Sequence, residues 1–279
     1  MRDLKGRNAI VTGASRGLGV HIARALAAEG VNLALVARTS DAISSLAQEL
    51  TEKGIRAVPL TADLADTSGL DAVIERAEAE LGAIDILVNN AGIDGIRIFA
   101  DESAAQTEQM VRTNLLSPML LTHKLLPRLL SRQSGHIVNI ASLAGKSSAP
   151  YSVSYSSSKA GLVAFSHCLR NELQGTGVSV SVICPGFVTD AGMFFASAIR
   201  KHGAQVSPLL GTSKPEHVAR AVVRALRKDS IELPVNPGPI RIIMAINQLA
   251  PSMVSWVQDR LLGVNAMMRK VALADRNDA

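Results

Sequence analysis

The sequence has few cysteines and few aromatic residues. Its 279 residues include two cysteines, Cys168 and Cys184, and aromatic side chains make up only 3% of the chain. Two thiols form neither a disulfide framework nor a metal-binding spacing, so we interpret both as buried apolar residues in a reducing compartment. The six histidines form no pair of the zinc type either, and we therefore expect no metal site.

Long apolar runs and clusters of basic residues are also missing. No stretch of 18 uninterrupted apolar residues occurs, which argues against a membrane-spanning helix. The first residues pass from charged side chains directly into a strand pattern without the apolar core of a signal peptide, so we expect a cytoplasmic protein. The net charge is +5 but forms no basic stripe, which disfavours nucleic-acid binding and is compatible with a phosphorylated ligand.

Apolar residues make up 47% of the chain and alternate between two patterns. Short runs rich in Val, Ile and Leu predict strands at 8–11, 32–37, 57–60, 84–88, 136–140 and 178–183. Apolar residues at helical spacing predict helices at 20–29, 42–53, 68–81, 102–131, 154–174 and 215–228. This alternation predicts a single α/β domain with a doubly wound parallel sheet and right-handed crossovers.

The chain changes character after residue 190. Residues 191–214 are rich in Gly, Ser and Phe with weak periodicity, which suggests either a substrate lid or an ordinary connecting segment. Met193, Phe194 and Phe195 within it suggest an apolar substrate wall, with packing alone as the alternative. We expect a dinucleotide-binding catalytic domain at 1–239, with the lid at about 191–214, and an apolar helical extension at 240–279.

A glycine-rich turn, TGASRGLG at residues 12–19, joins the first predicted strand to the first predicted helix. Glycines allow the backbone to approach a pyrophosphate closely, and the start of the helix supplies N–H donors. A purely structural turn is the alternative, but the position between strand and helix favours a dinucleotide site.

The end of the second predicted strand indicates the type of nicotinamide cofactor. The chain continues there as Val36-Ala37-Arg38, without the acidic residue that holds the ribose 2′-hydroxyl of NAD. Arg38, together with Arg16 from the glycine turn, suits a 2′-phosphate because guanidinium groups bind phosphate bidentately. We predict NADP(H) in preference to NAD(H); two solvated surface arginines are the alternative.

Tyr155 and Lys159 lie four residues apart in a predicted helix and so share one face. A nearby ammonium and the positive charge of an oxidised nicotinamide would favour phenolate, so we predict a lowered Tyr155 pKa and an acid/base role. Ser142 follows a predicted strand and so lies at the carboxyl end of the sheet, where ligands of such sheets bind. An ordinary helix pair and a turn-forming serine are the alternatives.

Taken together, the chain resembles the short-chain dehydrogenase/reductase family in its main single-domain branch. The matching motifs are the glycine turn at 12–19, NNAG at 89–92, Ser142, YSSSK at 155–159 and PG at 185–186, in family order over about residues 5–230. The resemblance implies a Rossmann-type sheet and a carbonyl reductase or alcohol dehydrogenase. Such an enzyme transfers a hydride between NADP(H) and a carbonyl/secondary alcohol pair.

The resemblance also implies roles for individual residues. Asn114 would kink its helix and hold a water that links Lys159 to solvent. Lys159 would bind the nicotinamide ribose, and Asp63 would contact the adenine. The implied catalytic residues are Asn114, Ser142, Tyr155 and Lys159. The implied cofactor-binding residues are Gly13, Ser15, Arg16, Gly17, Leu18, Gly19, Arg38, Asp63, Leu64, Asn90, Ala91, Gly92, Tyr155, Lys159, Pro185, Gly186, Val188 and Thr189. Asp190 departs from the second hydroxyl residue of many relatives, which would affect the lid rather than the chemistry.

The resemblance further implies a homodimer or homotetramer built on the helices that carry Asn114 and Tyr155. Tyr151, four residues before Tyr155, either faces the substrate or is a loop aromatic. The apolar lid favours a hydrophobic ketone, a 3-oxoacyl chain or a steroid-like substrate. A catalytically silent NADP(H)-sensing or membrane-surface binding protein on the same fold is the alternative, and the intact catalytic set argues against it.

The tail has apolar clusters at 240–249 and 253–271 with interspersed basic residues. Three interpretations stay open: packing onto the domain or a neighbouring subunit, a lid over an apolar substrate, and peripheral membrane association. In the last, Arg260, Arg269 and Lys270 would snorkel beside anionic headgroups.

Overall fold

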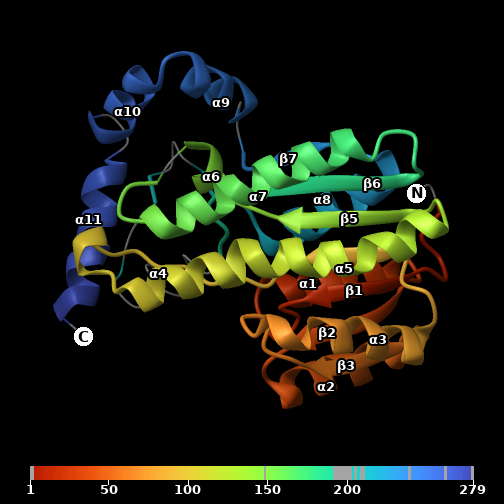
Figure 1. The fold of residues 1–279 in the computed structure, drawn as a ribbon. Coiled ribbons are helices and arrows are strands. Elements are labelled where there is room, and N and C mark those ends of the chain that lie inside the picture. Colours follow the sequence, from red (N-terminus) through yellow and green to blue (C-terminus); the bar gives the residue numbers. More distant parts are fainter. Residues whose placement is uncertain are drawn as a thin grey trace.

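The computed structural model describes residues 3–147, 149–190, 203, 206, 207, 211–237, 240–260 and 263–277. Within them, seven parallel strands form one sheet in the order β3-β2-β1-β4-β5-β6-β7 (Figure 1). The strands are β1 (Asn8–Thr12), β2 (Asn32–Ala37), β3 (Ala57–Thr61), β4 (Ile86–Asn89), β5 (Gly135–Ile140), β6 (Val178–Pro185) and β7 (Glu232–Val235). The predicted Rossmann-type doubly wound sheet in a single domain is therefore confirmed.

Helices cover both faces of this sheet. Those of one face are α1 (Leu18–Ala28), α2 (Ser40–Thr51) and α8 (Pro215–Lys228), whose buried side chains form one apolar cluster with alternate residues of the strands. Those of the other are α3 (Leu70–Leu81), α5 (Ser117–Ser131) and α7 (Val153–Glu172), which form a second cluster. The five inner strands are buried on both sides, as their Val-, Ile- and Leu-rich composition predicts, whereas the edge strands β3 and β7 are only partly buried.

The helix predicted at 102–131 is not continuous. It consists of α4 (Ala104–Val111), a π-helical turn (Arg112–Leu116) and α5. Single π-turns within helices are frequent at functional sites. Asn114 is buried at the centre of this one, so the interruption positions a residue of the implied catalytic set. Shorter helical elements are α6 (Ala144–Ser147) and 3₁₀ turns at Thr67–Gly69 and Phe99–Asp101.

Strand β7 was not predicted. It forms one edge of the sheet, pairing with β6 from Val182↔Glu232 to Pro185↔Val235. Pro234 lies within it and removes a backbone donor, which argues against a strand in the sequence and is tolerated only at such an edge.

The tail forms α9 (Ile240–Leu249), α10 (Pro251–Arg260) and α11 (Val264–Asn277), interrupted at Pro251 and Gly263. Figure 1 shows α9 and α10 projecting from the end of the sheet to which the strands point. Helix α11 packs Val264, Met268 and Val271 against the segment after β4, around Ile96 and Ile98. No helix of the described part of the chain combines the length and apolarity needed to cross a bilayer.

Most of the predicted lid at 191–214 lies outside the described residues, including Met193, Phe194 and Phe195. Its last part is described: Ser213 forms a parallel bridge with Val188. This bridge attaches the end of the segment to the chain that leaves β6.

Candidate active site

All of the predicted site residues lie at or just beyond the carboxyl ends of the strands. They follow β1 (Gly13, Ser15, Arg16, Gly17, Leu18, Gly19), β2 (Arg38), β3 (Asp63, Leu64), β4 (Asn90, Ala91, Gly92), β5 (Ser142) and β6 (Gly186, Val188, Thr189), with Pro185 as the last residue of β6. Asn114 joins them from the π-turn, and Tyr155 and Lys159 from α7. Successive strands are added on one side of β1 up to β3 and on the other side from β4 onward, and such sheets bind ligands where this strand order reverses, between β1 and β4.

The glycine turn is built for close backbone approach. Gly13 and Gly17 adopt positive φ angles of 67° and 60°. A Cβ atom at Gly19 would lie 2.1 Å from the carbonyl oxygen of Gly13, and one at Gly13 would lie 2.8 Å from Cα of Ala91. A side chain is therefore excluded at Gly13 and at Gly19 by backbone atoms, which cannot move aside as a side chain can.

Helix α1 starts directly after this turn without a side-chain cap. Its N-cap residue is Gly17, and no side-chain oxygen accepts a hydrogen bond from the first turn. The first amides of a helix need acceptors, and with the helix dipole they favour an anion. The turn and the uncapped helix thus fit the pyrophosphate of a dinucleotide.

Thr12 and Asn90 join the glycine turn to the end of β4. The Thr12 hydroxyl accepts hydrogen bonds from the backbone N–H groups of Asn90 (2.9 Å) and Ala91 (3.0 Å) and donates to the Val88 carbonyl (3.2 Å). Asn90 Nδ2 donates to the carbonyl oxygens of Thr12 (2.9 Å) and Gly13 (3.2 Å). Sequence reasoning missed Thr12; its only signal was a hydroxyl residue at the end of an apolar strand.

Arg16 and Arg38 are exposed, and neither forms an ion pair with another described residue. Asp63 is also exposed, and its Oδ1 accepts a hydrogen bond from the backbone of Ala65 (3.0 Å). Leu64 is buried, and its carbonyl accepts from the Ser117 hydroxyl. The two guanidinium groups are accordingly available to an anionic group next to the glycine turn.

Tyr155 and Lys159 lie one turn apart on α7. The Lys159 Nζ atom is 5.9 Å from the centre of the Tyr155 ring and donates a hydrogen bond to the Ile140 carbonyl (2.9 Å). Ser142, which follows β5, is hydrogen-bonded to Tyr155 through its side chain. Its hydroxyl also accepts from the backbone N–H of Ala144 (3.1 Å). A serine, a tyrosine and a lysine thus meet at the end of β5.

The lowered Tyr155 pKa is predicted for a site that also holds an oxidised nicotinamide, and the chain alone shifts this pKa in the opposite direction. Burial raises the pKa of Tyr155 to about 12, and the negative charge of Asp94 acts in the same direction, whereas the hydrogen bond with Ser142 opposes them. Burial also lowers the pKa of Lys159 to about 8. The desolvation of both side chains outweighs their mutual interaction. Tyr155 is consequently a protonated phenol at neutral pH, which is the form that donates a proton.

Asn114 connects the π-turn to this group. Its Oδ1 accepts from the backbone N–H of Ile93 (2.8 Å), and its Nδ2 donates to the Ile93 carbonyl (2.9 Å) and to the Ser158 hydroxyl (3.2 Å). Ser158 in turn donates to the Tyr155 carbonyl (2.7 Å). Ser158 was missed by sequence reasoning, although its position three residues after Tyr155 was a signal.

Gly92 lies where Asn114 and Lys159 converge. A Cβ atom there would be 3.1 Å from Asn114 Oδ1 and 3.5 Å from Lys159 Nζ. Gly186, after β6, is equally constrained, since a Cβ atom would be 2.3 Å from Asn236 Oδ1. Thr189 then donates its backbone N–H to the Ser213 carbonyl (2.9 Å), which ties this side of the site to the described end of the predicted lid.

Tyr151 borders the site from the loop before α7. Its φ angle is 59°, an uncommon conformation for a bulky residue, and its carbonyl accepts from the backbone N–H of Arg97 (2.8 Å). Its side chain packs in the cluster that includes Ile96 and Met268 of α11. The tail therefore contributes to the apolar surroundings of the residues next to Tyr155.

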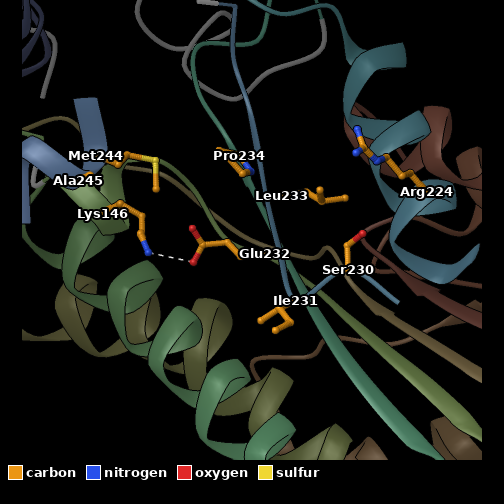
Figure 2. Close-up of a pocket in the computed structure, with 9 residues that line it drawn as sticks. All are labelled: Lys146, Arg224, Ser230, Ile231, Glu232, Leu233, Pro234, Met244 and Ala245. Carbon is orange, nitrogen blue, oxygen red and sulfur yellow. Dashed lines mark hydrogen bonds and ion pairs between the residues drawn. The ribbon is translucent and has the colours of Figure 1, made fainter. Parts of the chain in front are cut away.

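An open pocket of about 590 Å³ lies beside the edge strand β7. Figure 2 shows its lining residues Lys146, Arg224, Ser230, Ile231, Glu232, Leu233, Pro234, Met244 and Ala245. Lys146 Nζ and Glu232 Oε2 form an ion pair at 2.9 Å across it. None of Asn114, Ser142, Tyr155 and Lys159 lines this pocket, so it is separate from the site described above.

The cysteines play no part in the site. Cys184 is buried in β6, as predicted, but Cys168 is exposed on α7, so the prediction that both are buried is wrong for Cys168. Nothing in the described part of the chain brings together three or more His, Cys, Asp or Glu side chains in a way that would hold a metal ion.

The burial of Lys159 predicts a specific pH dependence of stability. Its pKa is about 8 in the folded chain, against 10.5 for an unperturbed lysine, so between these values the unfolded chain binds more protons. The free energy of unfolding should therefore rise as the pH increases from 8 toward 10.5, by on the order of 3 kcal/mol in total. Urea unfolding across this range measures it.

The matched variant for this measurement is Lys159→Met, which keeps an unbranched buried side chain and loses the amine. Its unfolding free energy should lack the extra rise, while all other titrating groups contribute equally to both proteins. Parallel pH profiles for the two proteins would contradict the assignment. The pH range that is useful for this comparison ends near pH 10. Above it, the raised pKa of Tyr155 makes the free energy of unfolding fall as the pH increases.

Comparison with known proteins places this geometry in a family. The chain matches the family model for short chain dehydrogenase over residues 7–200. It is 41% identical over 262 residues to the ketoacyl reductase HetN of Nostoc sp., covering 92% of this chain and 90% of that protein. It is 32% identical over 257 residues to dehydrogenase/reductase SDR family member 7B of Bos taurus, covering 88% and 79% respectively. A crystal structure of a metagenomic short-chain oxidoreductase in complex with NADP superposes with a TM-score of 0.70 at 29% identity, covering 84% of this chain and 97% of that one.

Proposed function

Because the chain belongs to the short-chain dehydrogenase/reductase family, whose members are NAD(P)-dependent oxidoreductases, we propose that it uses NADPH to reduce a hydrophobic ketone. One observation carries this proposal: a partly buried, protonated Tyr155 is hydrogen-bonded to Ser142 beside the buried Lys159 at the carboxyl end of the sheet. A phenol in this position is an acid aimed at the place where ligands of such sheets bind.

The residues of the chain have separate tasks in this reaction. When bound at the glycine turn, NADPH supplies the hydride that the carbonyl carbon receives. Ser142 donates a hydrogen bond to the substrate oxygen and orients it, and Tyr155 Oη gives that oxygen its proton. Lys159 is close enough to stabilise the phenolate that remains. Asn114 is hydrogen-bonded both to Ile93, after β4, and to Ser158 of α7. These bonds fix the position of α7, and with it Tyr155 and Lys159, relative to the end of β4.

The preference for NADPH over NADH is part of this proposal. It is supported by Arg16 and Arg38, which are exposed next to the glycine turn and have no ion pair with a described residue. Guanidinium groups bind a 2′-phosphate through charge-assisted hydrogen bonds. The relative of known structure carries NADP, which is consistent with the same choice here.

For the substrate, we favour a 3-oxoacyl chain or another hydrophobic ketone such as a steroid-like compound. The cluster of Ile96, Ile98, Tyr151 and α11 forms an apolar surface that includes Tyr151, four residues before Tyr155. The relative from Nostoc is named as a ketoacyl reductase. Such a substrate would bury its chain against this cluster while its carbonyl group meets Ser142 and Tyr155.

We also propose that the protein is cytoplasmic and works as a homodimer or homotetramer, with residues 1–239 as the catalytic domain and 240–279 as an extension. Val111 on α4 and Val153 on α7 are exposed apolar residues on the two helices expected to pair between subunits. Sedimentation velocity of the full chain measures this. A monomer at micromolar concentration would contradict it.

The test of function is NADPH consumption over a panel of 3-oxoacyl thioesters, aryl ketones and steroid ketones. We expect turnover with NADPH that exceeds turnover with NADH and is highest for 3-oxoacyl thioesters. Tight NADPH binding without turnover on any ketone or aldehyde would contradict the proposal and favour a cofactor-sensing protein on the same fold.

A further inference from the structure

Helices α9 and α10 expose a row of large apolar side chains. Ile242, Ile246, Leu249, Met253 and Trp256 follow one another at intervals of four and three residues, with 62, 36, 86, 52 and 57% of their surfaces exposed. We refer to these five residues as the apolar ridge. Single exposed apolar residues are normal on protein surfaces, but a contiguous group of this kind marks an interaction site.

The ridge points away from the body of the protein. On α9, Ile242, Ile246 and Leu249 share one side because of their helical spacing. Met244 and Asn247 lie on the opposite side, since two residues correspond to a rotation of about 200°. Asn247 Nδ2 donates a hydrogen bond to the Lys146 carbonyl (3.0 Å), and Met244 points into the pocket beside Lys146 (Figure 2). Helix α9 is thus attached by its other side, which leaves Ile242, Ile246 and Leu249 outward. On α10, the exposed fractions of Met253 and Trp256 show that both side chains face solvent.

The shape of this region suits a flat surface. Helices α9 and α10 project from the end of the sheet, so the ridge can touch a plane before the rest of the molecule does (Figure 1). Neither helix has the length and apolarity of a membrane span. Short amphipathic helices with Trp and Leu on the apolar side lie in the interface of a bilayer rather than across it.

The charged side chains of α9, α10 and α11 indicate which kind of surface the apolar ridge contacts. Among the side chains of α9, α10 and α11 that the structure describes, three are basic and exposed, namely Arg260, Arg269 and Lys270, and one is acidic, Asp259. Arg260 is exposed one turn after Trp256. A symmetric contact with a second copy would bring like charges together, whereas anionic headgroups attract them.

We propose that the apolar ridge docks the protein peripherally on an anionic lipid surface. Leu249 and Trp256 enter the boundary between headgroups and acyl chains, and Arg260 reaches the phosphate groups. Helix α11 follows directly and packs on Tyr151 and Ile96. Docking therefore brings the apolar side of the candidate active site next to the membrane, where hydrophobic substrates are concentrated.

Trp256 is the only tryptophan of the chain, so its fluorescence reports on the ridge alone. Full-length protein is titrated with vesicles of phosphatidylcholine, or of equal parts phosphatidylcholine and phosphatidylglycerol. We expect co-sedimentation and a blue shift of the emission with the anionic vesicles, and weaker binding at high salt. Equal binding to both vesicles, or no emission change, would overturn the proposal.

The variant Leu249→Ser/Met253→Ser keeps the Trp256 reporter, and we expect it to bind anionic vesicles at least tenfold more weakly. The control is Ile231→Ser, an exposed apolar residue on the body, which should bind as the wild type does. Unchanged unfolding midpoints show that both variants fold.

Unimpaired binding by the double variant would overturn the proposal. So would a loss of self-association in the absence of vesicles, because the ridge would then contact a second copy. Neither readout depends on turnover.

Discussion

The variant Tyr155→Phe is expected to reduce ketone turnover by about a hundredfold or more. Phe preserves the ring packed in this buried site but removes the hydroxyl that bonds to Ser142 and carries the proton. The raised pKa of Tyr155 makes the phenol the resident form at neutral pH, so its loss removes the acid for carbonyl reduction. Steady-state kcat with NADPH and a 3-oxoacyl thioester measures this effect.

Two controls separate catalysis from structure. The NADPH affinity of Tyr155→Phe, followed by cofactor fluorescence, should change little, because a change confined to the proton transfer lowers kcat. Tyr151→Phe removes the hydroxyl of the neighbouring tyrosine and should retain most of the turnover. If Tyr155→Phe were nearly as active as the wild type, the acid/base assignment would be wrong.

The variant Arg38→Asp is expected to reverse the choice of cofactor. It removes a guanidinium that suits a 2′-phosphate and places a carboxylate at the end of β2. Charge-assisted hydrogen bonds contribute about 1.5–3 kcal/mol each, and repulsion between carboxylate and phosphate adds to their loss. A carboxylate at this position also accepts a hydrogen bond from the 2′-hydroxyl of NADH. The ratio of kcat/KM for NADPH to that for NADH should fall by roughly a hundredfold.

The matched control is Arg76→Asp, which makes the same change of charge at an exposed position in α3. It should change kcat/KM for NADPH and for NADH only slightly, because the charge of an exposed side chain on α3 is screened by solvent and salt. An unchanged cofactor ratio in Arg38→Asp would mean that Arg38 is a solvated surface residue. In that case the NADPH preference would need another source, with Arg16 as the next candidate.

Much of the fold follows from local patterns in the sequence. Six of the seven strands were predicted because buried parallel strands are short apolar runs, and the ends of the β2 and α8 segments agree with the structure. The two departures have local causes. Pro234 argues against a strand at β7. The apolar periodicity of residues 102–131 predicts one regular helix, and only the family resemblance implies a kink at Asn114, where the structure has the π-turn.

The site was predictable as a set of residues but not as a network. The motif residues were found because each has a fixed position relative to a strand end. Thr12 and Ser158 were not, because their importance comes from partners 78 and 44 residues away. The direction of the Tyr155 pKa shift in the chain alone was not predictable either, for a related reason. Proximity to Lys159 is visible in the sequence, whereas the burial of both groups, which dominates, is not.

The sequence by itself determined the class of fold, the glycine turn, the carboxyl-end position of the site and the chemistry of its side chains. These features depend on short-range spacing and on the apolar character of each segment, which a linear chain records. Only the tertiary structure decided the protonation of Tyr155, the π-turn at Asn114 and the outward direction of the apolar ridge. Each of these depends on how far a group is removed from water and on which distant residues contact it instead. Both are properties of the packed chain.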